Sequence, residues 1–342
     1  MRLKFWGVRG SIPSPNNPEN VRWRLERILE AARGRSLETA EDLDVFLSSL
    51  PRHLLASVGE NTACVELCSG EDRLILDAGS GLRNLGLNLV RRRSFTENEL
   101  YLAIDGHVDL SAYEPSLLEA GDLNLSILLT HTHWDHIQGF PFFAPAFVAG
   151  NRISIYGQDA GQLTQAMELQ QSSPAMFPLP LAGLGAELSF HSLPQAGQAF
   201  GSLYVKALPV PHPGGCLAFR INDASGKSLV YATDYEFPDA DSPEAADFIN
   251  FISGADVLIS DTQYTYMESV AREGWGHSTS FGALDLTMRA GVKHFFLFHH
   301  DPEHSDAKLL DNLDKSRAYY QMMSDQGEMN IDLAMEGLTL DF

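Results

Sequence analysis

The chain has 342 residues, of which 44% are hydrophobic and 20% charged, as in a globular protein with a sizeable core. Its formal net charge of −21 argues against a protein that wraps a nucleic-acid duplex or lies on an anionic membrane, since both need a basic surface. A small anionic substrate stays compatible with this charge, because bound metal ions can reverse its sign locally.

The N-terminal part alternates between a strand, a loop and helices. A strand is predicted over 2–8, followed by a loop rich in Pro and Asn. Residues 20–50 have the periodicity of two amphipathic helices. The predicted apolar face is Val21, Leu25, Ile28, Leu29 and Ala32 in the first helix, and Leu43, Phe46, Leu47 and Leu50 in the second. We interpret residues 12–58 as a helical insertion into a single domain that spans 1–342.

The rest of the chain is dominated by strands separated by helices. Strands are predicted at 62–68, 73–79, 123–130, 152–157, 187–193, 202–210, 216–223, 228–234, 256–261 and 293–300. Helices are predicted at 80–93, 161–171, 242–253, 280–291 and 306–325, and the acidic segment 94–122 is irregular. Two groups of strands with helices outside predict two packed sheets flanked by helices.

Three histidines and one aspartate fall within six positions directly behind the apolar strand 123–130. His131 and His133 are two residues apart, so both side chains point the same way on an extended segment. Asp135 and His136 follow where the chain turns, at a strand end of the kind that gathers α/β active sites. This set suits two metal ions a few ångströms apart better than one.

The sequence HTHWDH at 131–136 resembles the HxHxDH signature of the metallo-β-lactamase fold superfamily. The family expects further ligands at later strand ends, and "PVPHPGG", "YATDYE" and "FLFHHDP" match them with His212, Asp234 and either His299 or His300. The resemblance covers nearly the whole chain outside 12–58. It implies an α/β fold, namely a four-layer αββα sandwich of two mixed β-sheets flanked by helices.

The resemblance also implies a ligand set for two divalent metal ions. His131, His133 and His212 are expected at the first metal, Asp135, His136 and His299 at the second, and Asp234 between them. His299 is preferred to His300 because the last ligand ends an apolar strand, although a slip of one residue would exchange them. His300 is then expected to face the substrate or support the ligands. Zinc is favoured by the imidazoles, and manganese tolerates the same ligands.

The segment "GWGHST" (274–279) resembles an element of the phosphodiesterase branch of this superfamily, which includes tRNA 3′-processing enzymes and a cyclic phosphodiesterase of phosphonate catabolism. The resemblance implies that His277 contacts a phosphate oxygen or protonates the leaving oxygen. "WGVRGSIPSP" resembles the same branch, and Arg9 in its loop is expected to bind phosphate, unless it is a surface residue in a turn. Asp77 and Asp261 end apolar strands and are expected to accept hydrogen bonds from ligand histidines or from the backbone at the strand end, and not to be ligands.

Together these features predict a dinuclear metal-dependent hydrolase that cleaves a small or cyclic phosphodiester with a hydroxide bridging both metals, with Asp135 and His277 as catalytic residues. Hydrolysis of a lactone, thioester or amide, a nuclease acting on single-stranded ends, and a metal-binding regulatory module without turnover are the alternatives. Only 21 residues separate His212 from Asp234, too few for the basic arm of tRNA-processing enzymes, which argues against nucleic acid as a partner.

The remaining predictions concern the surroundings of the protein. Cys64, Cys68 and Cys216 form no CxxC pair, which predicts reduced thiols in a cytoplasmic protein. The sequence has no signal peptide and no run of 18 apolar residues, so no membrane association is expected. The insertion could form a lid over the site or the interface of a homodimer.

Overall fold

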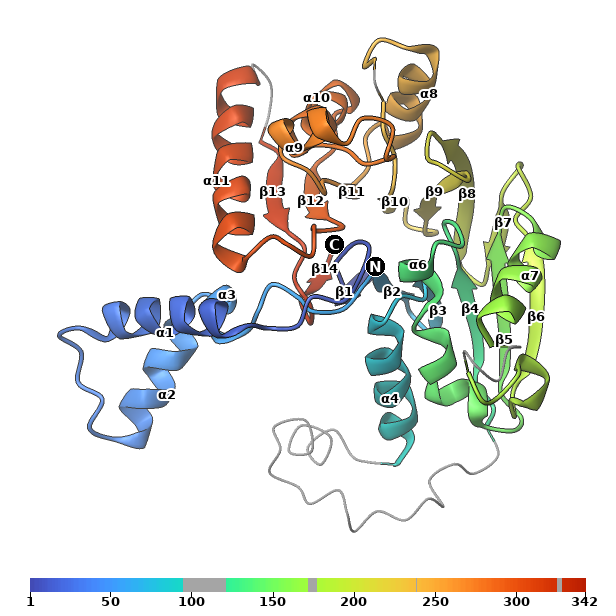
Figure 1. The fold of residues 1–342 in the computed structure, drawn as a ribbon, viewed down its shortest axis with the longest axis horizontal. Coiled ribbons are helices and arrows are strands. Elements are labelled where there is room, and N and C mark those ends of the chain that lie inside the picture. Colours follow the sequence, from blue (N-terminus) through green and yellow to red (C-terminus); the bar gives the residue numbers. More distant parts are fainter. Residues whose placement is uncertain (95–120, 172–176, 238, 325–327) are drawn as a thin grey trace.

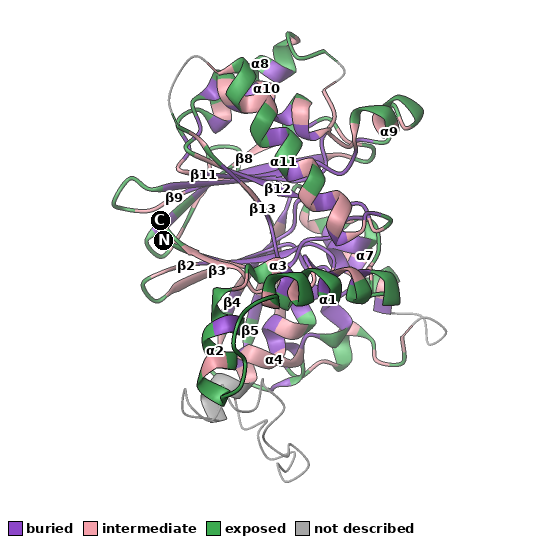
Figure 2. Ribbon diagram, turned by 90° about the vertical axis from the view of Figure 1, so that its left-hand side faces the viewer, coloured by how far each residue is buried: buried purple, intermediate pink, exposed green. Residues whose placement is uncertain are grey.

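Two β-sheets pack face to face, and helices cover both outer faces (Figures 1 and 2). The computed structural model describes residues 1–94, 121–171, 177–237, 239–324 and 328–342. Within these ranges each sheet has seven strands, in the orders β14-β1-β2-β3-β4-β5-β6 and β13-β12-β11-β10-β9-β8-β7. The segment 94–122, which the sequence predicts to be irregular, lies outside the described residues except at its two ends.

Both sheets are mixed. The first contains β1 (Arg2–Gly7), β2 (Cys64–Ser69), β3 (Asp72–Leu76), β4 (Asn124–Leu128), β5 (Arg152–Gly157), β6 (Glu187–Ser192) and β14 (Thr339–Asp341). The second contains β7 (Gln198–Phe200), β8 (Leu203–Val210), β9 (Cys216–Asn222), β10 (Ser228–Ala232), β11 (Val257–Asp261), β12 (His294–Phe298) and β13 (Asn330–Leu333). The pairs from β3 to β6 and from β10 to β13 are parallel, and the other pairs are antiparallel.

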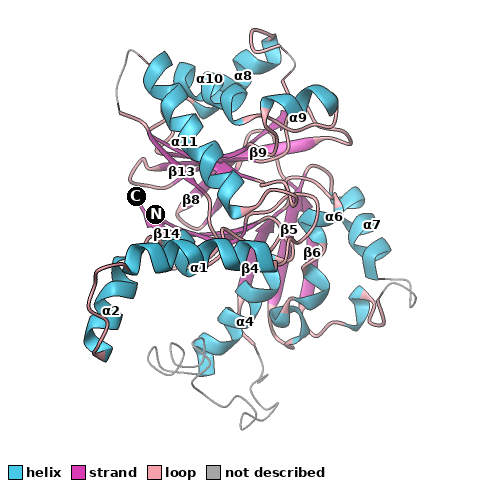
Figure 3. Ribbon diagram, turned by 60° about the vertical axis from the view of Figure 1, so that its left-hand side comes forward, coloured by secondary structure: helices cyan, strands magenta, loops and turns pink. Residues whose placement is uncertain are grey.

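Helices form the two outer layers (Figure 3). The first sheet carries α4 (Gly81–Ser94), α6 (Trp134–Ile137), α7 (Ala160–Gln171) and the 3-10 helices η3 (Phe140–Phe142), η4 (Ala144–Phe147) and η5 (Leu181–Gly183). The second carries α8 (Pro243–Ile252), α9 (Tyr266–Ala271), α10 (Ser280–Ala290) and α11 (Asp306–Met323). No helix of the described residues is long and apolar enough to cross a membrane.

Three apolar layers hold these elements together. Residues such as Phe5, Leu67, Phe219 and Phe298 fill the space between the two sheets. One further cluster packs α8, α10 and α11 against the second sheet, and another packs α4 and α7 against the first. This arrangement confirms the predicted four-layer αββα sandwich.

The insertion forms three helices, α1 (Pro18–Ala32), α2 (Ala40–Ser49) and α3 (Arg52–Leu55), and α1 and α2 extend away from the sheets (Figure 1). The apolar face of α1 does not pack against the body of the protein. Leu25 and Leu29 are 53% and 67% exposed, whereas Asn20 and Arg24 are buried. The reason is electrostatic: Arg24 Nη1 pairs with the buried carboxylate of Asp306 at 2.5 Å, which turns the adjacent face of the helix towards the body.

Several short elements are missing from the predictions, among them the strands β7, β13 and β14 and the helices α3 and α9. Each has three to six residues, too few for a clear hydrophobic period. Their pairing depends on distant parts of the chain, as in β14, where Leu340 pairs with Leu3. Since β14 pairs with β1, both termini lie on the first sheet, and Met1 N donates to Phe342 O at 2.9 Å.

Candidate metal centre

Strand ends from both sheets converge on one cluster of histidines and aspartates. His131 to His136 follow β4 of the first sheet, and the other groups follow β8, β10 and β12 of the second. Because parallel strands end at the same edge of their sheet, these side chains meet there. The structure brings together all seven predicted ligands: His131, His133, Asp135, His136, His212, Asp234 and His299.

One group of potential ligands consists of three imidazoles and one carboxylate. His131, His133, His212 and Asp234 have ligand atoms that all lie within 4.8 Å of one another. Asp234 Oδ2 lies 3.7 Å from His131 Nε2 and 3.8 Å from His212 Nε2. Burial lowers the pKa of His131, His133 and His212, which favours the neutral imidazole that binds metal. We call this group the first ligand set.

The second ligand set contains two imidazoles and two carboxylates. His299 Nε2 lies 3.3 Å from Asp135 Oδ2 and 3.2 Å from Asp234 Oδ1. His136 Nε2 lies 3.4 Å and 3.3 Å from the same two oxygens. Asp234 therefore offers one carboxylate oxygen to each set.

The residues present fit two divalent cations. His131 Nε2 is fully buried and has no hydrogen-bond partner among the described residues, an arrangement that costs free energy unless a ligand occupies the position. Imidazole nitrogens and carboxylate oxygens are the donors that zinc and manganese accept. His299, not His300, is the histidine after β12 that joins the set.

Hydrogen bonds from neighbouring residues fix the ligand rings. His136 Nδ1 lies 2.8 Å from Asp77 Oδ2, an oxygen that also accepts from the Tyr231 hydroxyl at 2.8 Å. His212 Nδ1 lies 2.9 Å from Gly276 O. In each ring the bonded Nδ1 leaves Nε2 facing the ligand set, which is the usual arrangement around metal-binding histidines. The predicted role of Asp77 as an acceptor is confirmed.

His299 has a comparable support that the sequence did not reveal. Its Nδ1 lies 2.9 Å from Gln263 Oε1. Gln263 follows β11 in the segment "DTQY". Apart from its position two residues after Asp261, nothing in the sequence indicates that its side-chain amide contacts a ligand histidine.

Strained backbone accompanies the two ligand sets. Among the described residues, Ser11, Asp77, Asp234 and His299 are the non-glycine positions with positive φ, between 55° and 62°. Such a conformation costs of order 1–3 kcal/mol at each residue and persists only where the surroundings enforce it. All four residues are ligands or contact one, so the strain is concentrated at this centre.

His277 lies beside the ligand sets. Its Nδ1 is 2.8 Å from Asp261 Oδ2 and 4.0 Å from Asp234 Oδ2, and its ring stacks on His299 with centroids 5.1 Å apart. Burial lowers its pKa, but the carboxylate of Asp261 outweighs this and raises the pKa of His277 to about 9. Asp261 thus accepts from His277, and it also accepts from the backbone N–H of Asp234 at 3.1 Å.

The structure contradicts the prediction that Arg9 and His300 face the substrate. Arg9 is 2% exposed, and its guanidinium donates to three backbone carbonyl oxygens. Its Nε donates to Gly59 O at 2.7 Å, and its Nη1 donates to Asp301 O at 3.1 Å and to His304 O at 2.9 Å. His300 is also buried, and its Nε2 donates to Ala334 O at 2.9 Å. Burial lowers the pKa of His300 to about 3, so it stays neutral. Both side chains are parts of the core.

A different arginine lies near His277. The Arg272 guanidinium is 4.9 Å from the centroid of the Tyr264 ring, and that ring meets His277 edge to face at 5.5 Å. Two tryptophans near the centre are largely exposed. Trp134 lies between the potential ligands His133 and Asp135, and Trp275 precedes Gly276, whose carbonyl oxygen contacts His212. Sequence reasoning missed Arg272, although it stands two residues before "GWGHST".

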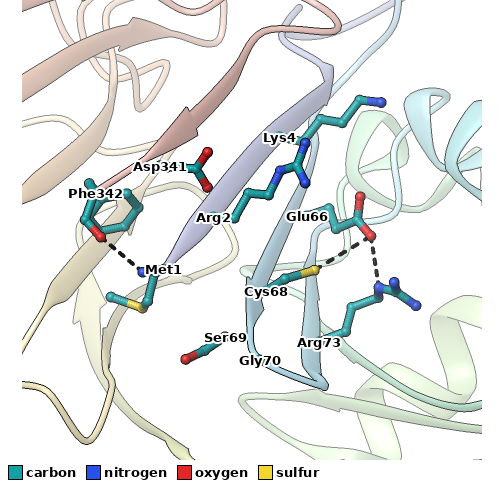
Figure 4. A pocket seen from close by; sticks show the side chains of 10 residues that line it. All are labelled: Met1, Arg2, Lys4, Glu66, Cys68, Ser69, Gly70, Arg73, Asp341 and Phe342. Atoms are coloured by element: carbon teal, nitrogen blue, oxygen red, sulfur yellow. Dashed lines mark hydrogen bonds and ion pairs between the residues drawn. The ribbon is translucent and has the colours of Figure 1, made fainter.

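A separate hollow of about 530 Å³ lies at the opposite end of β1 and β2, beside both termini (Figure 4). Arg2, Lys4, Glu66 and Arg73 line it, and Arg73 Nε lies 2.8 Å from Glu66 Oε1. It contains no residue of either ligand set.

Residues 73–300, two thirds of the chain, match the model of the family described as the beta-lactamase superfamily domain. The chain belongs to the β-lactamase superfamily. The matched range contains all seven potential ligands and His277 but excludes Arg9 and the insertion.

Two solved structures share the fold of this chain. The metallo-β-lactamase fold protein YhfI from Bacillus subtilis superposes with a TM-score of 0.58 at 20% identity, over 99% of this chain and 98% of that chain. A diphosphatase of the PhnP family superposes with a TM-score of 0.55 at 17% identity, over 100% and 97% of the two chains.

A curated relative, ribonuclease Z from Picrophilus torridus, is 35% identical over 113 residues. The match covers 32% of this chain and 34% of the relative, so it spans about a third of the length of either protein. The prediction against a nucleic-acid partner, which rested on net charge and a short connection, is not confirmed, because this relative is named as a ribonuclease.

Proposed function

We propose that this protein is a hydrolase of phosphodiesters that uses two divalent metal ions. The observation that carries the proposal is the position of Asp234, whose two carboxylate oxygens face two separate ligand sets. His131, His133 and His212 would hold one ion, Asp135, His136 and His299 the other, and Asp234 both. When bound, two such ions neutralise charge on phosphoryl oxygens and lower the pKa of water.

The residues of the chain supply orientation and a proton. His277 donates Nδ1–H to Asp261, which leaves Nε2 as the atom that can pass a proton to a departing alkoxide. Asp261 stabilises the cationic ring and holds the backbone of Asp234 at the same time. One carboxylate thereby fixes the relative positions of the proton donor and the shared ligand.

The substrate proposed is a small or cyclic phosphodiester, and an RNA phosphodiester is the second candidate. The ribonuclease Z relative supports the second candidate. The donor set favours zinc, and manganese is the second choice. We also propose that residues 1–342 form one domain carrying the insertion at 12–58, which the pairing of β14 with β1 supports.

The test is a substrate panel on chelator-treated protein reconstituted with Zn²⁺ or Mn²⁺. The panel contains bis(4-nitrophenyl) phosphate, a 2′,3′-cyclic nucleotide, a short RNA, a lactone and a thioester. We expect metal-dependent cleavage of at least one phosphodiester and little activity on the last two. Turnover of the lactone or thioester alone would assign a different hydrolase, and bound metal without any turnover would indicate a regulatory module.

A further inference from the structure

Arg9 lies in a short loop, residues 9–11, that joins β1 to the insertion. Its buried guanidinium contacts three carbonyl oxygens, those of Gly59, Asp301 and His304. Its Nη2 lies 3.7 Å from Asp306 Oδ1. Two segments distant in sequence, at residue 59 and at 301–306, are thus tied to one side chain, which fixes the loop against the body of the protein.

This loop contacts the second ligand set directly. Ser11 N donates to Asp135 Oδ2 at 2.7 Å, the oxygen that faces His136 and His299. Gly10 approaches the His299 ring so closely that an added Cβ would lie 2.5 Å from Cε1. The loop therefore determines where one carboxylate oxygen and one imidazole of the second set are held.

The first ligand set is supported from elsewhere. His212 is bonded to Gly276, and His131 Nδ1 lies 3.1 Å from the Thr130 hydroxyl. Among the described residues, no hydrogen bond joins His131, His133 or His212 to the 9–11 loop. A shift of this loop would consequently affect the two sets unequally.

We propose that Arg9 is a positioning residue for the second metal site. The guanidinium anchors the 9–11 loop, the loop presents the Ser11 N–H to Asp135, and that hydrogen bond sets the carboxylate towards His136 and His299. The inference rests on the proposed function only in requiring that the two sets bind metal. It replaces the substrate-binding role that the sequence suggested for Arg9.

Arg24 provides a matched control. It pairs with the other oxygen of Asp306 at 2.5 Å and is buried like Arg9, but it belongs to α1, and its hydrogen bond goes to Asp306 and not to the loop. Arg24→Met therefore removes a buried cation from the same ionic cluster without removing the anchor of residues 9–11. Gly10→Ala is the complementary variant, because it keeps Arg9 and displaces the loop from His299.

The experiment measures zinc per chain after equilibrium dialysis against buffered Zn²⁺, together with the visible spectrum of the Co²⁺-substituted protein. We expect two metals per chain in the wild type and in Arg24→Met, with a lower melting temperature in the latter. Arg9→Met and Gly10→Ala should retain one metal and bind the second about 10–100-fold more weakly, the usual effect of losing a supporting contact. Arg9→Lys should recover only part of the affinity.

Two results would overturn the inference: wild-type affinity for both metals in Arg9→Met, or an equal loss of both metals in Arg9→Met and Arg24→Met. If Arg9→Met does not fold, the metal affinities of Gly10→Ala decide the question, and wild-type affinity for both metals in that variant would overturn the inference. Metal binding is measured without turnover, so a wild type that binds two metals and cleaves no phosphodiester would contradict the proposed function and leave this inference standing.

Discussion

The metal centre and the insertion differ in how their side chains are held. At the centre the rings of His136, His212 and His299 are each held by a hydrogen bond at Nδ1, and the backbone has a positive φ at Asp77, Asp234 and His299. In the insertion the apolar residues of α1 face solvent, and Arg24 anchors that helix through a buried ion pair. The side chains of the candidate metal centre are each fixed by several contacts, whereas the insertion is held by a few.

The largest effect is expected at the shared ligand. Asp234→Ala removes a carboxylate from both ligand sets, so it should reduce bound zinc from two ions towards none and abolish phosphodiester cleavage. Metal analysis and the rate on bis(4-nitrophenyl) phosphate measure this. Asp135→Ala, which touches only the second set, is the matched variant and should keep one ion. Full activity in either variant would contradict a dinuclear centre.

A substitution of His277 tests proton donation separately from metal binding. His277→Ala should keep both metals, because this side chain belongs to neither ligand set, and should lower kcat by about 10²–10⁴, as expected for a general acid. The decrease should be smaller for a substrate whose leaving group is an activated phenol. Loss of metal in this variant would instead indicate that His277 is a ligand. A third group of potential ligands, which contains Asp234, Asp261, His277 and His299, would allow this.

Substitution of Asp77 should lower metal affinity less than substitution of a ligand does, and more than substitution of any residue of the insertion. Asp77→Asn weakens the acceptor of His136 Nδ1, and we expect metal affinity to fall about 10–100-fold. Tyr231→Phe removes one donor to the same oxygen and leaves the His136 contact intact, so its loss should be smaller. Equal effects of the two variants would show that core packing, not ring orientation, controls affinity.

The metal centre could be predicted from sequence because residue type and spacing carry the information. Two histidines two residues apart behind an apolar strand, followed by Asp135 and His136, can be read from the chain alone. Exposure cannot be read in this way. Arg9 stands in a polar loop next to Gly10, which suggested a surface role, yet three distant carbonyl groups enclose it.

The same reason explains the orientation of α1. The hydrophobic period of this helix is correct, but period alone does not say which element lies opposite. The body presents the buried carboxylate of Asp306, which selects the Arg24 face. The proposed homodimer and lid roles of the insertion stay predictions, and the exposed Leu25 and Leu29 mark the surface on which either would depend.

In the insertion, substitution of a charged residue should therefore lower the free energy of unfolding more than substitution of an apolar residue. Leu29→Gln should change the free energy of unfolding by no more than about 0.5 kcal/mol, because the side chain is mostly exposed and glutamine is a good helix former. Arg24→Met should cost about 3 kcal/mol, since it leaves a fully buried carboxylate with one arginine fewer. Urea denaturation of dilute protein, with Leu128→Ala as a core reference expected at about 2–5 kcal/mol, measures both. If Leu29→Gln proves the more damaging of the two, the apolar face of α1 is buried in solution, and the helix meets a surface outside the chain.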